Sequence, residues 1–405
     1  MNEAEKQSSR ISGFFKRSIE ERARIVAGFA GMDRTSIEWA LAQGGLNVFH
    51  ADRLIENVVG TMALPFAVAT NFLVDGRDYL IPMVIEEPSV VAAASKAAVL
   101  VRENGGFHTE ADDPVTISQI EILGLDDPFG AAGELEKSKD KWIAIANETQ
   151  PQLVSLGGGA RDMEFRPDVG KGDGRLVVHL FVDCRDAMGA NMVNTMAERL
   201  APVMAEACGG YPGLKILSNL ADHRMVRVWV EISPHTLSFG DYAGERVRDG
   251  IVGASRFAES DPYRAATHNK GILNGIDAVV LATGNDWRAV EAGAHAYAGK
   301  GKGYRPLATW HVGEDGQLVG KMEMPLVMGT VGGTTRVHPA AAFAIKLLGN
   351  PTAMQLSRIT ASAGLASNLA ALRALSTEGI QKGHMKLHQR RMEKERLEHA
   401  ARKAV

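Results

Sequence analysis

The stretch over residues 266–293 constrains this chain most, because it surrounds a short apolar run with ionisable and amide side chains. The run covers residues 278–282, and such a run beside glycine is typical of a buried strand or a buried turn of helix. Lys270 precedes the run and Asp286 follows it. A lysine beside buried structure needs a carboxylate partner or its pKa falls, which is how catalytic lysines arise. A purely structural Lys–Asp ion pair at a helix end is the alternative.

The length and net charge of the chain limit the classes of protein to which it can belong. At 405 residues the chain is long enough for two or three domains. Its net charge of −3 gives no overall basic field, which argues against nucleic acid as a partner. The longest apolar stretch, residues 90–101, is interrupted by Ser95 and Lys96 and is too short to cross a bilayer. We therefore expect no membrane partner.

The cysteines and the N-terminus indicate the compartment. Cys184 and Cys208 cannot form a disulfide framework, which favours a reducing compartment. Both lie among apolar neighbours and are expected to be buried, unreactive thiols. The first residues contain no apolar signal-peptide region. A soluble, cytoplasmic protein is the expectation.

Turn signals predict a β-hairpin over residues 71–85, with Asp75-Gly76 at its turn. The second strand ends in two acids, the second of which is Glu87, directly before an expected helix over residues 89–104. Acids at such a junction lie near a helix N-terminus, where the helix dipole favours negative charge. Helix capping is a sufficient explanation for these two acids unless Glu87 contacts a cation or a substrate.

The pattern of expected strands and helices over residues 113–219 predicts a separate, inserted domain. The pattern is strand, helix, strand, strand, helix, strand, which is that of the split βαβ motif. Its clearest elements are strands over 115–123 and 176–184 and helices over 129–148 and 186–208. We expect a large mixed α/β domain built from residues 1–112 and 220–376 around this insert, and a short C-terminal segment over 377–405. The predicted fold class is α+β.

The second part of the large domain is predicted mainly from helical periodicity. The expected elements are a strand over 225–232, helices over 242–257, 287–297, 339–348 and 357–375, a hairpin turn at 314–316 and a glycine loop over 329–335.

Common catalytic signatures are absent from the sequence. It contains no strand followed by G-x-G-x-x-G, no Walker A lysine, and no H-E-x-x-H or C-x-x-C, so no metal is expected. Two loop-to-helix glycine motifs are present, DAMGAN over residues 186–191 and GTVGGTT over 329–335. Glycine there lets backbone N–H groups approach a phosphate. Together with Glu87, Lys270, Asp286 and His384, these loops suit polarising a carbonyl and moving protons and hydride.

Longer motifs show a family resemblance. In this order, ENVVGT, EEPSVVAAAS, DAMGANMVNTMAE, THNKGILNGIDAVVLATGNDWRAVEAG, GTVGGTT and GHMKLH resemble the class II 3-hydroxy-3-methylglutaryl-CoA (HMG-CoA) reductases, over about residues 10–388. The resemblance implies NAD(P)H-dependent, four-electron reduction of HMG-CoA to mevalonate and CoA in the isoprenoid pathway. It also implies a ferredoxin-like cofactor domain and a homodimer with the active site at its interface.

The resemblance assigns roles to four catalytic residues. Lys270 would polarise the thioester carbonyl and stabilise the oxyanion. Glu87 would be the acid that helps to reduce mevaldehyde. Asp286 would sit beside Lys270 and tune its proton affinity. His384 would protonate the leaving CoA thiolate.

The resemblance also assigns binding residues. Substrate contacts fall on Ser89, Asn219, Arg264 and Asn274. Cofactor contacts fall on Asp186, Met188, Gly189 and Asn191. NADH-using members carry an acid ahead of Pro-x-Leu, where this chain has Gln150, and an uncharged residue does not repel a 2′-phosphate, which favours NADPH over NADH.

Two alternatives stay open at this point. The sequence cannot set direction, so oxidation of mevalonate to HMG-CoA is a rival reaction. Only 21 residues follow His384, where the resemblance implies a longer C-terminal flap, so we expect a shortened flap. A CoA-thioester-binding protein impaired in turnover by that short flap is the rival outside the enzymes.

Overall fold

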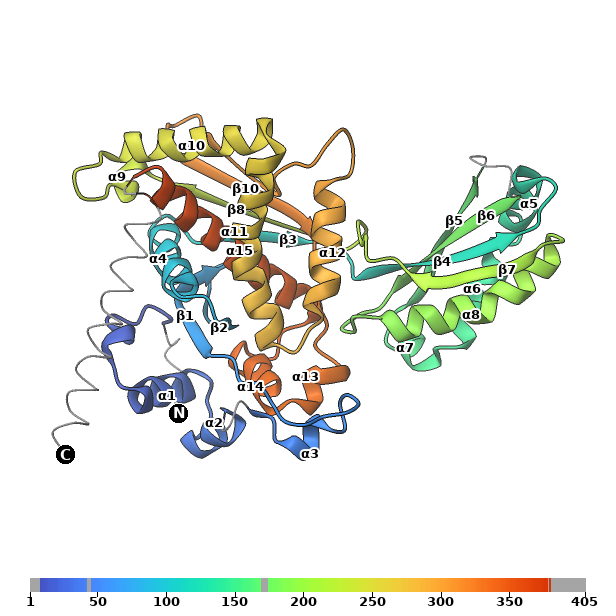
Figure 1. Ribbon diagram of the computed structural model, residues 1–405, viewed down its shortest axis with the longest axis horizontal. Coiled ribbons are helices and arrows are strands. Elements are labelled where there is room, and N and C mark those ends of the chain that lie inside the picture. Colours follow the sequence, from blue (N-terminus) through green and yellow to red (C-terminus); the bar gives the residue numbers. More distant parts are fainter. Residues whose placement is uncertain (1–7, 42–44, 169–173, 378, 380–405) are drawn as a thin grey trace.

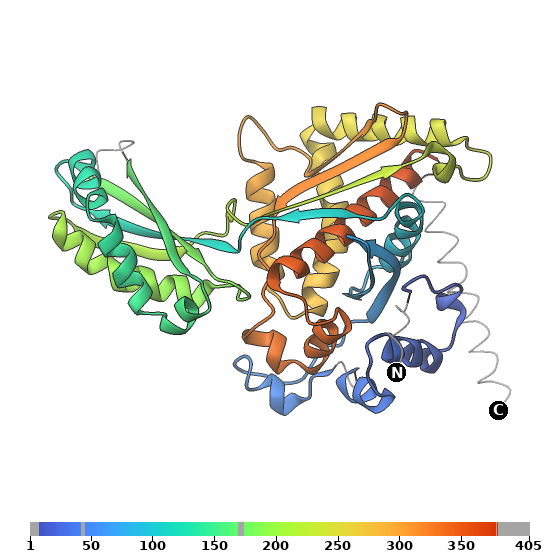
Figure 2. The same ribbon diagram turned by 180° about the vertical axis from the view of Figure 1, so that it is seen from behind.

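The computed structural model describes residues 8–41, 45–168, 174–377 and Gly379. His384 and nearly all of the predicted flap lie outside these residues. The described chain forms two lobes, a large one built from its first and last parts and a smaller one made of residues from the middle (Figures 1 and 2). Two connections join the lobes, one after β3 (His108–Ala111) and one before β8 (Met225–Ile232).

A four-stranded antiparallel sheet forms one side of the large lobe. Its order is β3-β8-β10-β9, where β10 is Leu318–Pro325 and β9 is Ala308–Val312. Along β8 the even-numbered residues from Val226 to Ile232 are buried, while Arg227, Trp229 and Glu231 lie on the other face. This alternation buries one face of the sheet against helices and leaves the other polar.

The buried face of the sheet packs on long helices (Figure 1). α15 (Ala353–Leu375) contacts α4 (Val90–Arg102), α10 (Gly244–Ser260) and α11 (Pro262–Ala282). α11 and α15 approach each other closely at two glycines. A Cβ built on Gly275 would lie 2.4 Å from the carbonyl oxygen of Ala363, and one on Gly364 would lie 2.8 Å from Ile276 Cγ1. A side chain at either position would collide, with backbone at Gly275 and with the Ile276 side chain at Gly364, so glycine lets the two helices approach this closely.

The predicted first hairpin is confirmed. β1 (Phe66–Val74) and β2 (Arg77–Val84) pair antiparallel, and the turn residues Asp75 and Gly76 have φ values of 48° and 76°. Positive φ at both central residues is the requirement of the type I′ hairpin turn. The second strand leads through Glu87 directly into α4.

The small lobe has the predicted βαββαβ pattern. Its antiparallel sheet has the order β5-β6-β4-β7, with the helices on one face (Figure 1). The elements are β4 (Val115–Leu123), α5 (Pro128–Glu136), α6 (Lys139–Glu148), α7 (Pro151–Ser155), β5 (Gly159–Asp168), β6 (Arg175–Asp183), α8 (Ala190–Ala207) and β7 (Tyr211–Leu217). The predicted cuts at 112/113 and 219/220 fall in the two connections between the lobes.

The single helix predicted over residues 129–148 is wrong, because the structure has two helices there. α5 ends at Glu136 and α6 begins at Lys139. The indole N–H of Trp142 donates to the carbonyl oxygen of Leu135 over 3.0 Å, so a buried side chain satisfies the end of α5. The apolar run over residues 278–282 belongs to α11 as buried helix, which resolves the choice between helix and strand.

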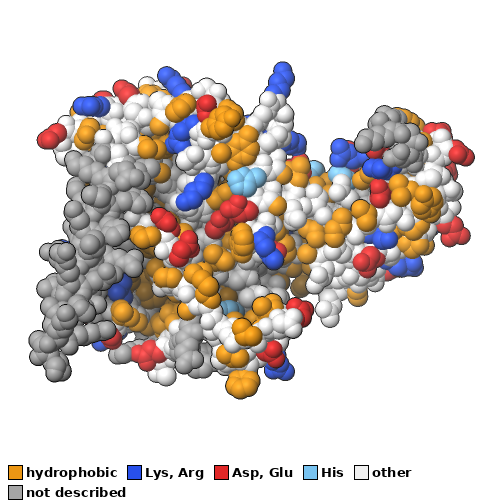
Figure 3. All heavy atoms as spheres, viewed as in Figure 1, with side chains coloured by type: hydrophobic (Ala, Val, Ile, Leu, Met, Phe, Trp, Pro, Cys, Tyr) orange, Lys and Arg blue, Asp and Glu red, His pale blue; other side chains and the backbone are white. Residues whose placement is uncertain are grey.

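The remaining elements cover one end of the large lobe and join its helices. They are η1 (Phe14–Lys16), α1 (Ile19–Phe29), α2 (Arg34–Leu41), α3 (Val48–Ala51), α9 (Pro234–Leu237), α12 (Trp287–Ala298), α13 (Gly333–Val337) and α14 (Pro339–Leu347). β3 was not predicted, because four residues of sequence HTEA carry too little alternation to be recognised. On the face shown in Figure 3, acidic and basic side chains are interspersed. Within the described ranges, no helix is both long and apolar enough to span a bilayer.

Candidate active site

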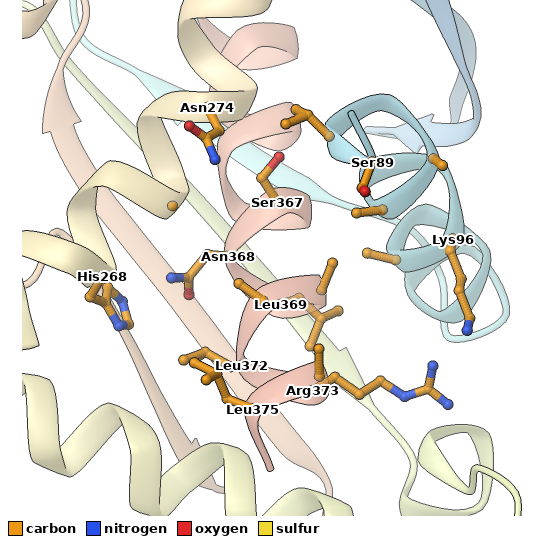
Figure 4. Close-up of a pocket in the computed structure, with 18 of the residues that line it drawn as sticks. Ser89, Lys96, His268, Asn274, Ser367, Asn368, Leu369, Leu372, Arg373 and Leu375 are labelled. Atoms are coloured by element: carbon orange, nitrogen blue, oxygen red, sulfur yellow. The ribbon is translucent and has the colours of Figure 1, made fainter. Parts of the chain in front are cut away.

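Five of the residues singled out by sequence line one cavity of about 500 Å³ in the large lobe. The cavity lies between α4, α11 and α15, and Figure 4 shows Ser89 and Asn274 on two of its walls. The five predicted residues in its lining are Glu87, Ser89, Arg264, Lys270 and Asn274. The chain therefore brings an acid, two cations and two neutral hydrogen-bonding groups to the same place.

Ser89 is held in a strained backbone conformation at the start of α4. Its φ is 81°, and its side chain makes no capping hydrogen bond. Its hydroxyl oxygen is buried and has no hydrogen-bond partner among the described residues. A non-glycine residue at positive φ and an unsatisfied buried hydroxyl both cost free energy, and such costs concentrate at functional sites. The hydroxyl of Ser89 is thus available to a ligand in the cavity.

α11 contributes the cationic wall. The side chain of Asp261 caps the helix by accepting from the backbone N–H of Arg264 over 2.7 Å. Burial lowers the pKa of Arg264, so an anion at this position would relieve the cost of desolvating its charge. Lys270 and Asn274 follow on the same helix at a spacing of four residues, which places them on one face.

His268 also lines the cavity and was not predicted. Its side chain is 2% exposed, and neither ring nitrogen has a hydrogen-bond partner among the described residues. Burial, reinforced by the positive charge of Arg264, lowers the pKa of His268 to about 4, so the ring is neutral near pH 7. In Figure 4, His268 of α11 faces Asn368 of α15. The Oδ1 of Asn368 accepts a hydrogen bond from Trp310 Nε1 over 2.7 Å. The only sequence signal for His268 is its position two residues before Lys270.

Within one chain, the structure does not bring Asp286 to Lys270. α11 continues as helix through the apolar run, so about 18 Å of helix separates Lys270 from Ala282. Asp286 is the N-cap of α12, where its carboxylate accepts from the N–H groups of Arg288 and Ala289 and pairs with the Arg288 guanidinium over 3.1 Å. In the described part of the chain, Lys270 forms no ion pair with Glu87 or Asp286. The role of both acids in holding this ammonium therefore stays a prediction, which for Asp286 requires a second subunit.

A carboxyl pair lies about two turns beyond Lys270 along α11, where the helix packs against α12. Asp277 is half-buried beside Glu291 of α12, and burial together with this neighbouring acid raises the pKa of Asp277 to about 8. Glu291 in turn pairs with His295 Nε2 over 2.8 Å. The Nδ1 of His295 lies 2.7 Å from the Tyr304 hydroxyl. This network, which ties α11 to α12, was not predicted.

Asp277→Asn is expected to remove a pH-dependent loss of stability. The folded-state pKa of Asp277 lies well above the ordinary value of an aspartate, so the proton it holds stabilises the fold fully below about pH 4, and this contribution is lost as pH rises toward 8. The asparagine keeps a donor and carries no charge. From pH 5 to pH 8 the wild type should lose on the order of 2 kcal/mol relative to the variant. Urea unfolding at both pH values measures this difference. Glu134→Gln, which removes an exposed acid paired with Lys137, should show no such gain.

The DAMGAN turn meets the requirements of a dinucleotide phosphate site. Gly189 is the N-cap of α8 with φ 102°, and a Cβ there would lie 2.4 Å from Cys184 Sγ. No side chain caps this helix, so its first N–H groups are free to meet a phosphate. Asn191 is exposed in the first turn of α8, and Met188 precedes the cap. The residues present therefore fit the diphosphate of a nicotinamide cofactor.

Three further predicted residues lie elsewhere. The carboxylate of Asp186 accepts from the backbone N–H of Ala353 over 2.7 Å, so it is already engaged with the large lobe. Asn219 is exposed in the connection between the lobes and does not line the cavity. Gln150 is the N-cap of α7 and makes no side-chain capping bond.

As predicted, Cys184 is buried and Cys208 is partly buried, and burial raises the pKa of both thiols.

An acid and cations line the cavity of the large lobe. The ferredoxin-like small lobe presents a glycine-capped helix N-terminus. Together these features define a two-domain NAD(P)-dependent oxidoreductase. A model of the hydroxymethylglutaryl-coenzyme A reductase family matches residues 18–389. The chain belongs to this family. It is an HMG-CoA reductase, which reduces HMG-CoA to mevalonate with NAD(P)H.

Individual relatives agree with this assignment. The chain is 52% identical over 388 residues to a 3-hydroxy-3-methylglutaryl-coenzyme A reductase of Archaeoglobus fulgidus, covering 95% of this chain and 87% of the relative. It is 36% identical over 338 residues to a probable reductase of Borreliella burgdorferi, covering 83% and 76%. The class II reductase of Streptococcus pneumoniae, solved with NADPH in open conformations, superposes with a TM-score of 0.86 at 42% identity, covering 90% of this chain and 99% of that one. This match confirms the predicted fold class.

Proposed function

We propose that the cavity between α4, α11 and α15 is the site where this chain reduces its thioester, with Lys270 as the group that stabilises the oxyanion. The observation that supports this most is the convergence of Glu87, Ser89 and Lys270 in one cavity, where the strained Ser89 keeps an unsatisfied hydroxyl. A cation aimed at a carbonyl oxygen stabilises negative charge that develops only during the reaction. Glu87 is the proton donor to the oxygen of the aldehyde in the second reduction.

The substrate's carboxylate and hydroxyl are bound by the neutral and cationic groups of the same cavity. The guanidinium of Arg264 can hold both oxygens of a carboxylate, which suits the free acid end of the hydroxymethylglutaryl group. The Ser89 hydroxyl and the Asn274 amide supply neutral hydrogen bonds. Bound cofactor supplies the hydride in both reductions, and the chain's own residues orient the acyl group and move protons. His384, outside the described residues, is the proposed acid for the departing thiolate.

The active enzyme is a homodimer in which Asp286 acts at the Lys270 of the other subunit. Two observations support this. Asp286 is remote from Lys270 in its own chain, and residues 55–62, which contain the ENVVGT motif, carry exposed apolar side chains. Ile55 is 65% exposed, Val59 is fully exposed and Met62 is 87% exposed. Apolar groups gathered on a surface segment mark an interface. Two unpaired thiols support a reducing compartment, and we place the enzyme in the cytoplasm.

Turnover tests the proposed function directly. Protein, HMG-CoA and NADPH are mixed, and oxidation of the reduced cofactor is followed by its absorbance. Reduction of thioester to alcohol requires two NADPH and two protons for each HMG-CoA and releases mevalonate and free CoA. Binding of the CoA ester without oxidation of either NADPH or NADH would overturn the proposal. The reverse reaction is assayed with mevalonate, CoA and oxidised cofactor.

NADPH is expected to be the preferred cofactor, and Gln150→Asp should shift this preference toward NADH. A carboxylate at the start of α7 repels a 2′-phosphate and accepts hydrogen bonds from a free ribose. We expect the ratio of kcat/KM values, NADPH over NADH, to fall about tenfold, or ~1.4 kcal/mol. The matched control is Gln152→Asp, which adds the same charge at an exposed position two residues further along α7. Equal shifts in both variants would show that Gln150 does not contact the ribose.

A further inference from the structure

Arg224 is a buried cation just before β8, and its guanidinium donates hydrogen bonds to three backbone carbonyl groups. The residue is 4% exposed. Its Nη1 donates to the carbonyl oxygens of Ala187 over 3.2 Å and Met188 over 3.3 Å, and its Nη2 donates to that of Met328. Burial lowers the pKa of Arg224 to about 10, which still leaves it charged near pH 7. Burying a charge is costly unless donors are satisfied, so these three bonds are needed for the fold.

The three carbonyl groups lie in or directly beside the two glycine motifs. Ala187 and Met188 belong to the DAMGAN turn, and Met328 directly precedes the glycine loop of the large lobe. The two segments touch directly, since a Cβ on Gly329 would lie 2.7 Å from the backbone nitrogen of Met188. The backbone N–H of Gly329 also donates to Asn285 Oδ1 over 2.7 Å. Arg224 thus joins one turn from each lobe.

Asp186 fixes the same turn to α15. Its carbonyl oxygen accepts from the N–H of Thr330 over 2.8 Å, and its carboxylate accepts from the N–H of Ala353 in the first turn of α15. The far end of that helix, from Asn368 to Leu375, lines the substrate cavity (Figure 4). The turn is therefore positioned by contacts with the same helix that forms a cavity wall.

We propose that Arg224 is a positioning residue for hydride transfer, which holds the DAMGAN turn, and with it the N-terminus of α8, at a fixed place relative to the substrate cavity. This rests on the proposed role of that turn in cofactor binding. Gly189 follows Met188 directly, so the carbonyl that Arg224 holds belongs to the residue before the helix cap. A planar guanidinium can reach carbonyls in several directions, whereas lysine offers one compact charge. Hydride transfer is sensitive to misplacement of about 1 Å.

The experiment compares Arg224→Lys and Arg224→Met with the wild type. We expect the dissociation constant of NADPH, measured by its fluorescence without substrate, to rise about tenfold or more, with a parallel rise in its KM and a fall in kcat. The KM for HMG-CoA should change less than twofold, because the cavity residues are not touched. Arg248→Met is the control, since it also removes a guanidinium bond to a carbonyl, that of Gly316, at a place remote from the turn.

Chemical rescue separates positioning from general loss of structure. Adding guanidinium ion to Arg224→Ala, at concentrations that leave the wild type folded, should recover NADPH affinity at least several-fold and should not affect Arg248→Ala. If folded Arg224→Lys and Arg224→Met bind NADPH as the wild type does, or if the KM values of both substrates rise equally, the proposal is overturned. A wild type that binds no nicotinamide cofactor would instead refute the proposed function.

Discussion

Lys270→Ala is expected to abolish reduction of HMG-CoA, with kcat lowered about 10²–10³-fold or more. The ammonium on α11 is the cation of the cavity placed to meet negative charge arising on a carbonyl oxygen, and losing one such donor typically costs this much. Steady-state turnover with saturating NADPH measures the effect. Binding of the CoA ester, measured by calorimetry, should survive, because Arg264 and Ser89, the residues proposed to bind the acyl group, remain in place.

The control for Lys270→Ala is Lys321→Ala. Lys321 is exposed on β10, away from the cavity, and its loss removes the same charge from the protein surface. It should leave turnover within twofold of the wild type. Near-normal reduction of the thioester by Lys270→Ala would remove the role proposed for this residue.

A hybrid dimer of two inactive variants is expected to regain activity. If Asp286 acts at the Lys270 of its partner, a Lys270→Ala subunit still supplies an intact Asp286 to a subunit that carries Asp286→Asn. Two-fold symmetry gives each dimer two sites, so a purified hybrid has one intact site and should show about half of wild-type turnover. Each parent homodimer should show about 1% or less. Co-expression with two affinity tags isolates the hybrid.

The hybrid distinguishes two arrangements of the site. A hybrid as inactive as its parents would mean that Lys270 and Asp286 do not combine across subunits. Because α11 separates these residues within one chain, Asp286 would then have no catalytic role and would serve only as the cap of α12. Asp286→Asn alone, with normal turnover, would lead to the same conclusion.

Local signals predicted the parts of the fold that rest on local chemistry. Asp75-Gly76 specifies its own turn, and alternation in residues 115–123 and a continuous apolar run in 176–184 specify two strands of the small lobe. The family resemblance assigned Glu87, Ser89 and Arg264 to the active site, and all three line one cavity, while their roles stay predictions. These successes share a cause, since each depends on a short run of residues or on a long matched motif.

Features that depend on distant contacts could not be predicted. A short apolar run fits a strand as well as a helix, so the distance between Lys270 and Asp286 was not available from the sequence. His268 and Arg224 owe their roles to burial against residues far along the chain. The break between α5 and α6 depends on where the Trp142 side chain packs, which periodicity alone does not reveal.

The contact of α11 with α15 through Gly275 and Gly364 limits how this enzyme can move. At Gly275 the backbone of α11 meets the carbonyl oxygen of Ala363, and at Gly364 the backbone of α15 meets the side chain of Ile276, so little room is left for side chains to rearrange between the two helices. We expect this helix pair to move as one unit. Replacement of spent cofactor between the two reductions is then expected to leave this wall of the acyl pocket in place, so that the half-reduced acyl group stays bound.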